Sequence, residues 1–83
     1  MPAPRVRTRE RRALATAIRV LRAERDLSQE AVESGGGLGA NAVGRMESGT
    51  SAPGFDSLIG AAEGLGISLG ELIAEYERQL AKP

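Results

Sequence analysis

Apolar residues recur at helical spacing along three long stretches of the chain. Leu14, Ile18 and Leu21 fall at i, i+4 and i+7, which predicts a helix over residues 8–25. Two further stripes of this kind lie in the second half of the chain: Phe55, Leu58, Ile59, Ala62 and Leu65 in the first, and Leu69, Leu72, Ile73, Tyr76 and Leu80 in the second. Each stripe lines one face of its helix, which is typical of helices packed on a common core.

Helix-ending and helix-starting residues separate the two later stripes. Gly66 follows the first of them and is expected to end its helix. Ser68-Leu69-Gly70-Glu71 then has the S-x-x-E form of a capping box, in which serine and glutamate satisfy backbone N–H groups at a helix start. The last helix is therefore predicted at residues 68–82.

Two shorter helices are predicted between the long ones. Ser28 suits the N-cap of a helix at about residues 28–34. This helix must be short, because Gly35-Gly36-Gly37 follows it and each glycine inside a helix costs on the order of 1 kcal/mol relative to alanine. The next helix is predicted from Ala40 to Ser48, with Gly49 as its terminator.

The composition limits the class of protein. A chain of 83 residues with only 2% aromatic residues suits one small all-α domain, a compact five-helix bundle, better than a sheet. We expect a flexible N-terminal tail at residues 1–7 and a single domain at residues 8–83. The sequence contains no cysteine and no histidine, so we expect no disulfide, metal site, cofactor or catalysis. No apolar run has the length of a signal peptide or a membrane span, and we therefore expect a cytoplasmic protein without a membrane partner.

Positive charge is concentrated in the first third of the chain. Lysine and arginine number 11, and so do aspartate and glutamate, which gives a formal net charge of zero. Most of the basic residues are early arginines, namely Arg5, Arg7, Arg9, Arg11, Arg12, Arg19, Arg22 and Arg25. A molecule polarised in this way can present a basic face to phosphate, although the arginines also fit an ordinary solvated helix face.

The centre of the chain carries a pattern that resembles a known family. Residues 27–49 read LSQEAVESGGGLGANAVGRMESG, with Ile18-Arg19-x-Leu21-Arg22 before them and Leu65-Gly66-Ile67-Ser68-Leu69-x-Glu71-Leu72 after them. In this order the motifs resemble the Cro/repressor-type (XRE) helix-turn-helix family, over about Leu14 to Ile73. The resemblance implies a five-helix bundle of the lambda-repressor-like type that binds double-stranded DNA.

The resemblance also implies which residues contact DNA. The recognition helix is expected at residues 39–48, in the major groove. Asn41 is suited to adenine and Arg45 to guanine, since each can form a bidentate pair with that base. Alternatively, Asn41 is a solvated helix residue, Arg45 a phosphate or surface residue, and Gln29 only a support of the turn. The implied DNA-binding residues are Ser28, Gln29, Gly39, Ala40, Asn41, Gly44 and Arg45, with Arg9, Arg12 and Arg19 as candidate phosphate contacts.

Two further features of the family have counterparts here. Arg22 and Glu47 match a pair that forms an internal salt bridge between the first helix and the end of the recognition helix. The backbone amides from Gly49 to Gly54 match the loop that grips phosphate.

Three residues depart from the family's pattern. Glu33 stands where the family has a small residue packed between two helices. A buried, unpaired carboxylate is costly, so we expect the helices to splay, or Glu33 to reach solvent or a basic partner. Gly39 replaces the usual Ser or Thr N-cap of the recognition helix, and Gly44 offers no side chain to a base. The reading surface is therefore sparse, and affinity is expected to depend on phosphate contacts and on salt.

We interpret the chain as a sequence-specific transcription regulator that acts as a homodimer. The apolar stripe of the last helix supplies the candidate interface, at Leu72, Tyr76 and Leu80, unless Tyr76 and Leu80 only cover their own core. The alternative is a protein-interaction or antitoxin-like module on the same fold, with a protein partner and weak or lost DNA binding. The sparse reading surface and Glu33 favour that alternative.

Overall fold

The computed structural model describes residues 6–50 and 52–83 of the chain. These residues form five helices and no strand, as predicted: α1 (Thr8–Glu24), α2 (Gln29–Gly35), α3 (Ala42–Ser48), α4 (Phe55–Leu65) and α5 (Leu69–Ala81). Of the predicted tail at residues 1–7, only Val6 and Arg7 belong to the described residues.

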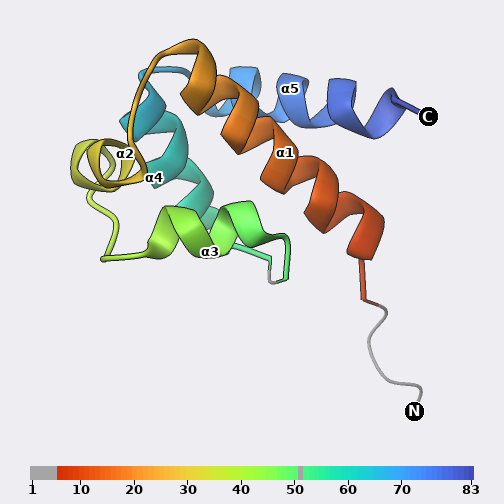
Figure 1. Ribbon diagram of the computed structural model, residues 1–83, viewed down its shortest axis with the longest axis horizontal. Helices are drawn as coiled ribbons and strands as arrows, with labels where there is room; N and C mark the ends of the chain where they lie inside the picture. Colours follow the sequence, from red (N-terminus) through yellow and green to blue (C-terminus); the bar gives the residue numbers. More distant parts are fainter. Residues whose placement is uncertain (1–5, 51) are drawn as a thin grey trace.

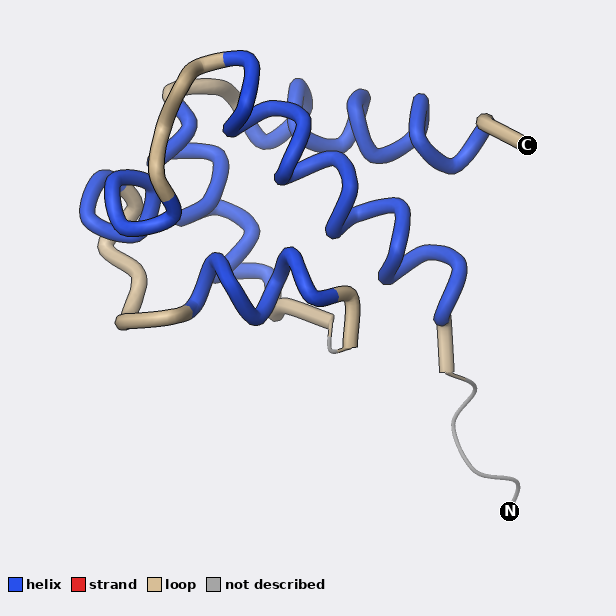
Figure 2. Tube along the Cα trace, viewed as in Figure 1, coloured by secondary structure: helices blue, strands red, loops and turns tan. Residues whose placement is uncertain are grey.

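The first helix organises the bundle. α1 crosses the molecule diagonally and packs against α5 on one side and α3 on another, while α2 packs mainly against α4 (Figure 1). A hydrogen bond of 3.1 Å from Arg9 Nη2 to the Leu80 carbonyl joins the start of α1 to the end of α5. Short loops connect the helices, and the α2–α3 loop leads into α3, the lower helix of the view (Figure 2).

No helix within the described residues is long and apolar enough by itself to cross a membrane. α4 and α5 pass a test of length and composition only as a pair, which is bent by 99°.

The core takes residues from the predicted stripes and adds Val32 of α2 and Val43 and Met46 of α3, whereas Phe55 lies outside it. Its largest fully buried side chains are Ile18, Val32, Val43 and Leu72. Phe55 was expected on the buried stripe of α4, but its side chain is 66% exposed. It is the first residue of α4 and precedes the part of that helix that enters the core, so the prediction of a buried Phe55 is wrong.

The predicted helix ends are confirmed where the signal is local. Ser68 Oγ accepts a hydrogen bond of 3.0 Å from the Glu71 N–H, and Glu71 Oε1 accepts one of 3.1 Å from the Ser68 N–H. This is the complete capping box of α5. Gly66 follows α4 at φ 75°, in the left-handed region where a residue without Cβ costs least.

Glycines bring α2 and α4 unusually close together. A methyl group added at Gly36 would overlap the backbone carbonyl of Gly60, and one added at Gly64 would overlap the carbonyl of Val32. The run Gly35-Gly36-Gly37 was predicted as a helix-breaking turn, and it does end α2. Within this run, Gly36 also allows a close contact between the backbones of α2 and α4, and a larger residue there would overlap the Gly60 carbonyl.

Candidate DNA interface

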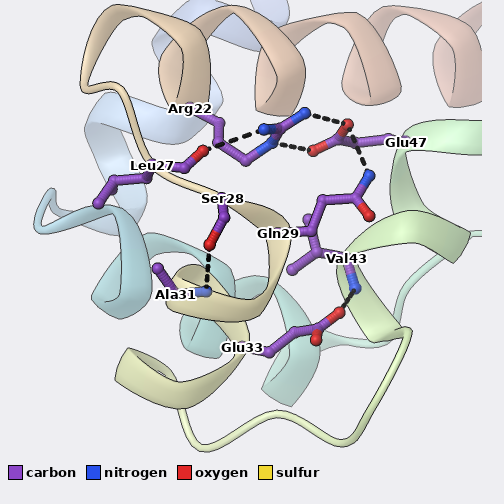
Figure 3. A network of polar contacts seen from close by, with 8 residues as sticks. All are labelled: Arg22, Leu27, Ser28, Gln29, Ala31, Glu33, Val43 and Glu47. Carbon is purple, nitrogen blue, oxygen red and sulfur yellow. Dashed lines mark hydrogen bonds and ion pairs between the residues drawn. The ribbon is translucent and has the colours of Figure 1, made fainter.

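Ser28 and Gln29 lie at the start of α2. Ser28 is the N-cap, and its Oγ accepts a hydrogen bond of 3.0 Å from the Ala31 N–H. Gln29 is the first helical residue, and its Nε2 donates to Glu47 Oε1 at 3.3 Å (Figure 3). The Gln29 amide therefore braces α2 against the far end of α3.

An ion pair fixes the C-terminal end of α3. Arg22 Nε donates to Glu47 Oε2 at 2.7 Å and Arg22 Nη2 donates to Glu47 Oε1 at 3.0 Å, a bidentate geometry. Arg22 Nη1 also donates to the Leu27 carbonyl at 3.0 Å, so one guanidinium ties α1 to the α1–α2 loop and to α3 (Figure 3). The Glu47 side chain is only 6% exposed. Its hydrogen bond raises the pKa of the Arg22 guanidinium above the ordinary value.

The third helix begins later than its sequence indicates. It was expected at residues 39–48 with Gly39 as N-cap, but it starts at Ala42 and its N-cap is Asn41. Gly39 and Ala40 belong to the preceding turn, in which the Ala42 N–H donates to the Gly39 carbonyl at 3.2 Å. Asn41 has φ 66°, a left-handed conformation that asparagine tolerates better than most residues. This geometry corrects the predicted N-cap.

Glu33 makes a contact that the sequence did not reveal. Its residue exposure is only 8%, and its Oε2 accepts a hydrogen bond of 2.9 Å from the backbone N–H of Val43 (Figure 3). We expected splayed helices, solvent or a basic side chain; the partner is instead the unsatisfied N–H at the start of α3. No local signal in the sequence marks this contact, because it depends on how α2 and α3 cross.

The outer face of α3 is exposed. Asn41 and Arg45 are both exposed, and Asn41 makes no side-chain capping bond. Arg45 Nη1 has one long contact, of 3.5 Å, with the Ala40 carbonyl. Gly44 lies under Gln29, since a methyl group added there would come within 3.4 Å of Gln29 Oε1. That distance is an ordinary van der Waals contact, so the brace between α2 and α3 does not require glycine at this position.

The predicted basic contacts lie on α1. Arg12 and Arg19 are both exposed, and Arg19 Nη2 donates to Thr16 Oγ1 at 3.1 Å. Sequence reasoning missed Arg11, whose Nη1 donates to the Thr50 carbonyl at 3.3 Å. That bond holds the start of α1 beside the loop that follows α3.

The predicted dimer residues differ in their environments. Leu72 has no exposed surface and belongs to the core, so it is removed from the candidate interface. Tyr76 and Leu80 are half-buried at the surface. Tyr76 borders an apolar hollow together with Leu14, Leu58 and Ile73.

The fold and these contacts define a helix-turn-helix domain, and comparison with known proteins agrees. A family model described as helix-turn-helix matches residues 18–72, so the chain belongs to the XRE-type helix-turn-helix family. The chain is 38% identical over 63 residues to the cryptic phage CTXphi transcriptional repressor RstR of Vibrio cholerae. That match covers 76% of this chain and 57% of the repressor, so the chain spans little more than half of its relative.

A solved structure has the same fold. The crystal structure of the clp gene regulator ClgR from Corynebacterium glutamicum matches with a TM-score of 0.76, over 96% of this chain and 81% of that one. The two sequences are 21% identical, so this likeness concerns the fold. The predicted five-helix bundle with a helix-turn-helix is confirmed.

Proposed function

We propose that this chain is a sequence-specific, DNA-binding transcription regulator that acts as a homodimer with α3 in the major groove. The observation that carries the proposal is the way α3 is held. A buried carboxylate makes a contact at each end of the helix. Glu33 of α2 accepts a hydrogen bond from the start of α3, and Glu47, in the last turn of α3, pairs with Arg22 of α1. The Arg45 side chain lies exposed between these two contacts, and the Asn41 side chain is exposed just before the helix. A short helix anchored at both ends with a free outer face suits the reading of base edges.

The remaining contacts with DNA would be made to phosphates. Ser28 and Gln29 stand at the start of α2, and we assign to them contacts with the DNA backbone. Arg12 and Arg19 add exposed positive charge on α1. Such contacts position the protein on the duplex without selecting a sequence, and they make the affinity depend on salt.

Dimerisation is part of the proposal because one helix-turn-helix buries little surface on DNA. Tyr76 and Leu80 on α5 are the residues we assign to the interface, with Leu72 left out. A two-fold axis near α5 would present two copies of α3 to successive half-sites of the duplex.

Arg45→Ala should weaken binding to the preferred sequence by about 1–3 kcal/mol, or roughly 5- to 150-fold, and relax the preference at one base position. The reason is that Arg45 would pair with the acceptor edge of a guanine. The measurement is a fluorescence-anisotropy titration with the duplex selected from a random pool by the wild-type protein and with variants of that duplex.

Arg12→Ala is the matched control, because it removes the same charge from an exposed site on α1. It should lower the affinity for all sequences and reduce the salt slope by about 1. If both variants lose the same affinity for random DNA, Arg45 does not read a base.

For Asn41 the informative variant is Asn41→Gly, since glycine removes the side-chain amide and still adopts φ 66° without strain.

A further inference from the structure

The start of α3 lacks the local capping that α2 and α5 possess. Ser28 and Ser68 each accept a hydrogen bond from the first turn of the helix that follows them. Asn41, the N-cap of α3, makes no such bond, and the first turn of α3 contains no acidic residue. The Ala42 N–H donates to the Gly39 carbonyl, but the next N–H of this end, that of Val43, would stay unsatisfied without a partner from elsewhere in the fold.

Glu33 supplies that partner across the turn. It lies on α2, ten positions before Val43, and its Oε2 is 2.9 Å from the Val43 nitrogen. The carboxylate is largely shielded from water and Val43 is completely buried. A charged acceptor at the positive end of a helix makes a shorter and stronger hydrogen bond than a neutral one. The bond therefore joins the two helices of the motif at a buried point.

A helix as short as α3 depends on its anchors. It has seven residues, and an isolated helix of this length is not stable in water. Glu47 holds its last turn through Arg22 and Gln29, whereas Glu33 holds its first turn. Asn41 immediately precedes the helix, so it lies at the end that Glu33 controls.

We infer that Glu33 is a positioning residue, which caps the recognition helix from α2 and thereby sets the orientation of Asn41 and Arg45 toward the bases. The inference rests on the proposed function, because orientation matters only if α3 reads DNA. Base readout needs side chains held to within a fraction of an ångström, whereas phosphate contacts tolerate a looser helix. Loss of the cap should therefore reduce sequence preference more than total affinity.

The test compares Glu33→Ala and Glu33→Gln with wild type, and uses Ser68→Ala as the matched control. Ser68→Ala removes an N-cap of similar type from α5, so it lowers stability without touching α3. Two quantities are measured for each protein. The first is the hydrogen-exchange rate of the Val43 amide, and the second is the ratio of affinities for the selected duplex and for a shuffled duplex of equal composition.

Glu33→Ala should accelerate Val43 exchange and lower the affinity ratio about tenfold, the effect of losing one charged hydrogen bond. The affinity for the shuffled duplex should hardly change. The Val43 exchange rate and the affinity ratio of Glu33→Gln should both lie between those of wild type and Glu33→Ala, because the glutamine amide oxygen still accepts a hydrogen bond. This variant also replaces Glu33→Ala in the test if the alanine variant fails to fold. Ser68→Ala should leave the affinity ratio as in the wild type and accelerate Val43 exchange no more than its loss of global stability accounts for.

An unchanged affinity ratio in Glu33→Ala would overturn the inference, and so would an equal fall of that ratio in Ser68→Ala. Unchanged Val43 exchange would overturn the capping contact itself. If the wild-type protein prefers no sequence, the proposed function fails and the positioning role fails with it. The Val43 exchange rate still decides in that case whether Glu33 caps α3, so the two failures are distinguishable.

Discussion

Gly64→Ala should lower the free energy of unfolding by about 3 kcal/mol, because the added methyl group has no space between α4 and α2. It would overlap the carbonyl of Val32 and approach the Cγ1 of the same residue to 2.9 Å. A backbone carbonyl inside α2 cannot rotate away, so the two helices must separate. In a domain of this size the loss corresponds to a fall in Tm of at least about 12 °C, measured from the helical circular-dichroism signal.

Gly70→Ala is the control for this substitution. Gly70 also lies in a helix, but the nearest atom to an added methyl group there is Ser68 Oγ at 3.7 Å, an ordinary contact. Alanine in a helix is favoured over glycine by up to about 1 kcal/mol, so Gly70→Ala should leave stability unchanged or raise it. Equal effects of the two variants would contradict the close packing of α2 on α4.

Glu47→Ala should cost about 2–3 kcal/mol of stability, because it leaves the guanidinium of Arg22 without its carboxylate. The Arg22 side chain is 24% exposed and keeps its hydrogen bond to the Leu27 carbonyl. The loss of stability is therefore smaller than for a fully buried charge that has lost its partner. The same variant frees the Gln29 amide and the last turn of α3. Denaturant unfolding of wild type, Glu47→Ala, Arg22→Ala and the double variant measures the effect.

In the double variant the losses should be clearly less than additive, with a coupling of at least about 1 kcal/mol. The control is the exposed pair of Glu24 and Arg25, whose charged atoms are 3.7 Å apart. Glu24→Ala should change stability by no more than about 0.5 kcal/mol, since solvent screens that pair. Additive losses at Arg22 and Glu47 would show that the ion pair does not hold α3.

The parts of the structure that local sequence signals predicted are those that depend on neighbours in the chain, whereas the distant pair of Arg22 and Glu47 was implied by the resemblance to the family. Ser28 and Ser68 each accept a hydrogen bond from an N–H group three residues further along the chain. Gly49 and Gly66 end helices through their own backbone conformation. Such signals are local, so they can be recognised without knowledge of the fold.

Apart from the start of α3, what the sequence did not predict depends on contacts between distant residues. The acceptor role of Glu33 follows from the crossing of α2 and α3, which brings its carboxylate to the Val43 N–H. The burial of Leu72 and the exposure of Phe55 depend on which part of each helical face meets the core. Likewise, Gly64 matters because α2 lies against it. Helical periodicity identifies a face but does not say which other element covers it.

Binding of the selected duplex and its shuffled counterpart by the wild-type protein, titrated at two salt concentrations, tests the central claim most directly. The claim is that this helix-turn-helix reads a DNA sequence through α3. We expect the selected duplex to bind about a thousandfold more tightly than the shuffled one, with both affinities falling as salt rises. Equal affinities for the two duplexes, or no binding at low salt, would contradict the claim and favour the protein-interaction alternative.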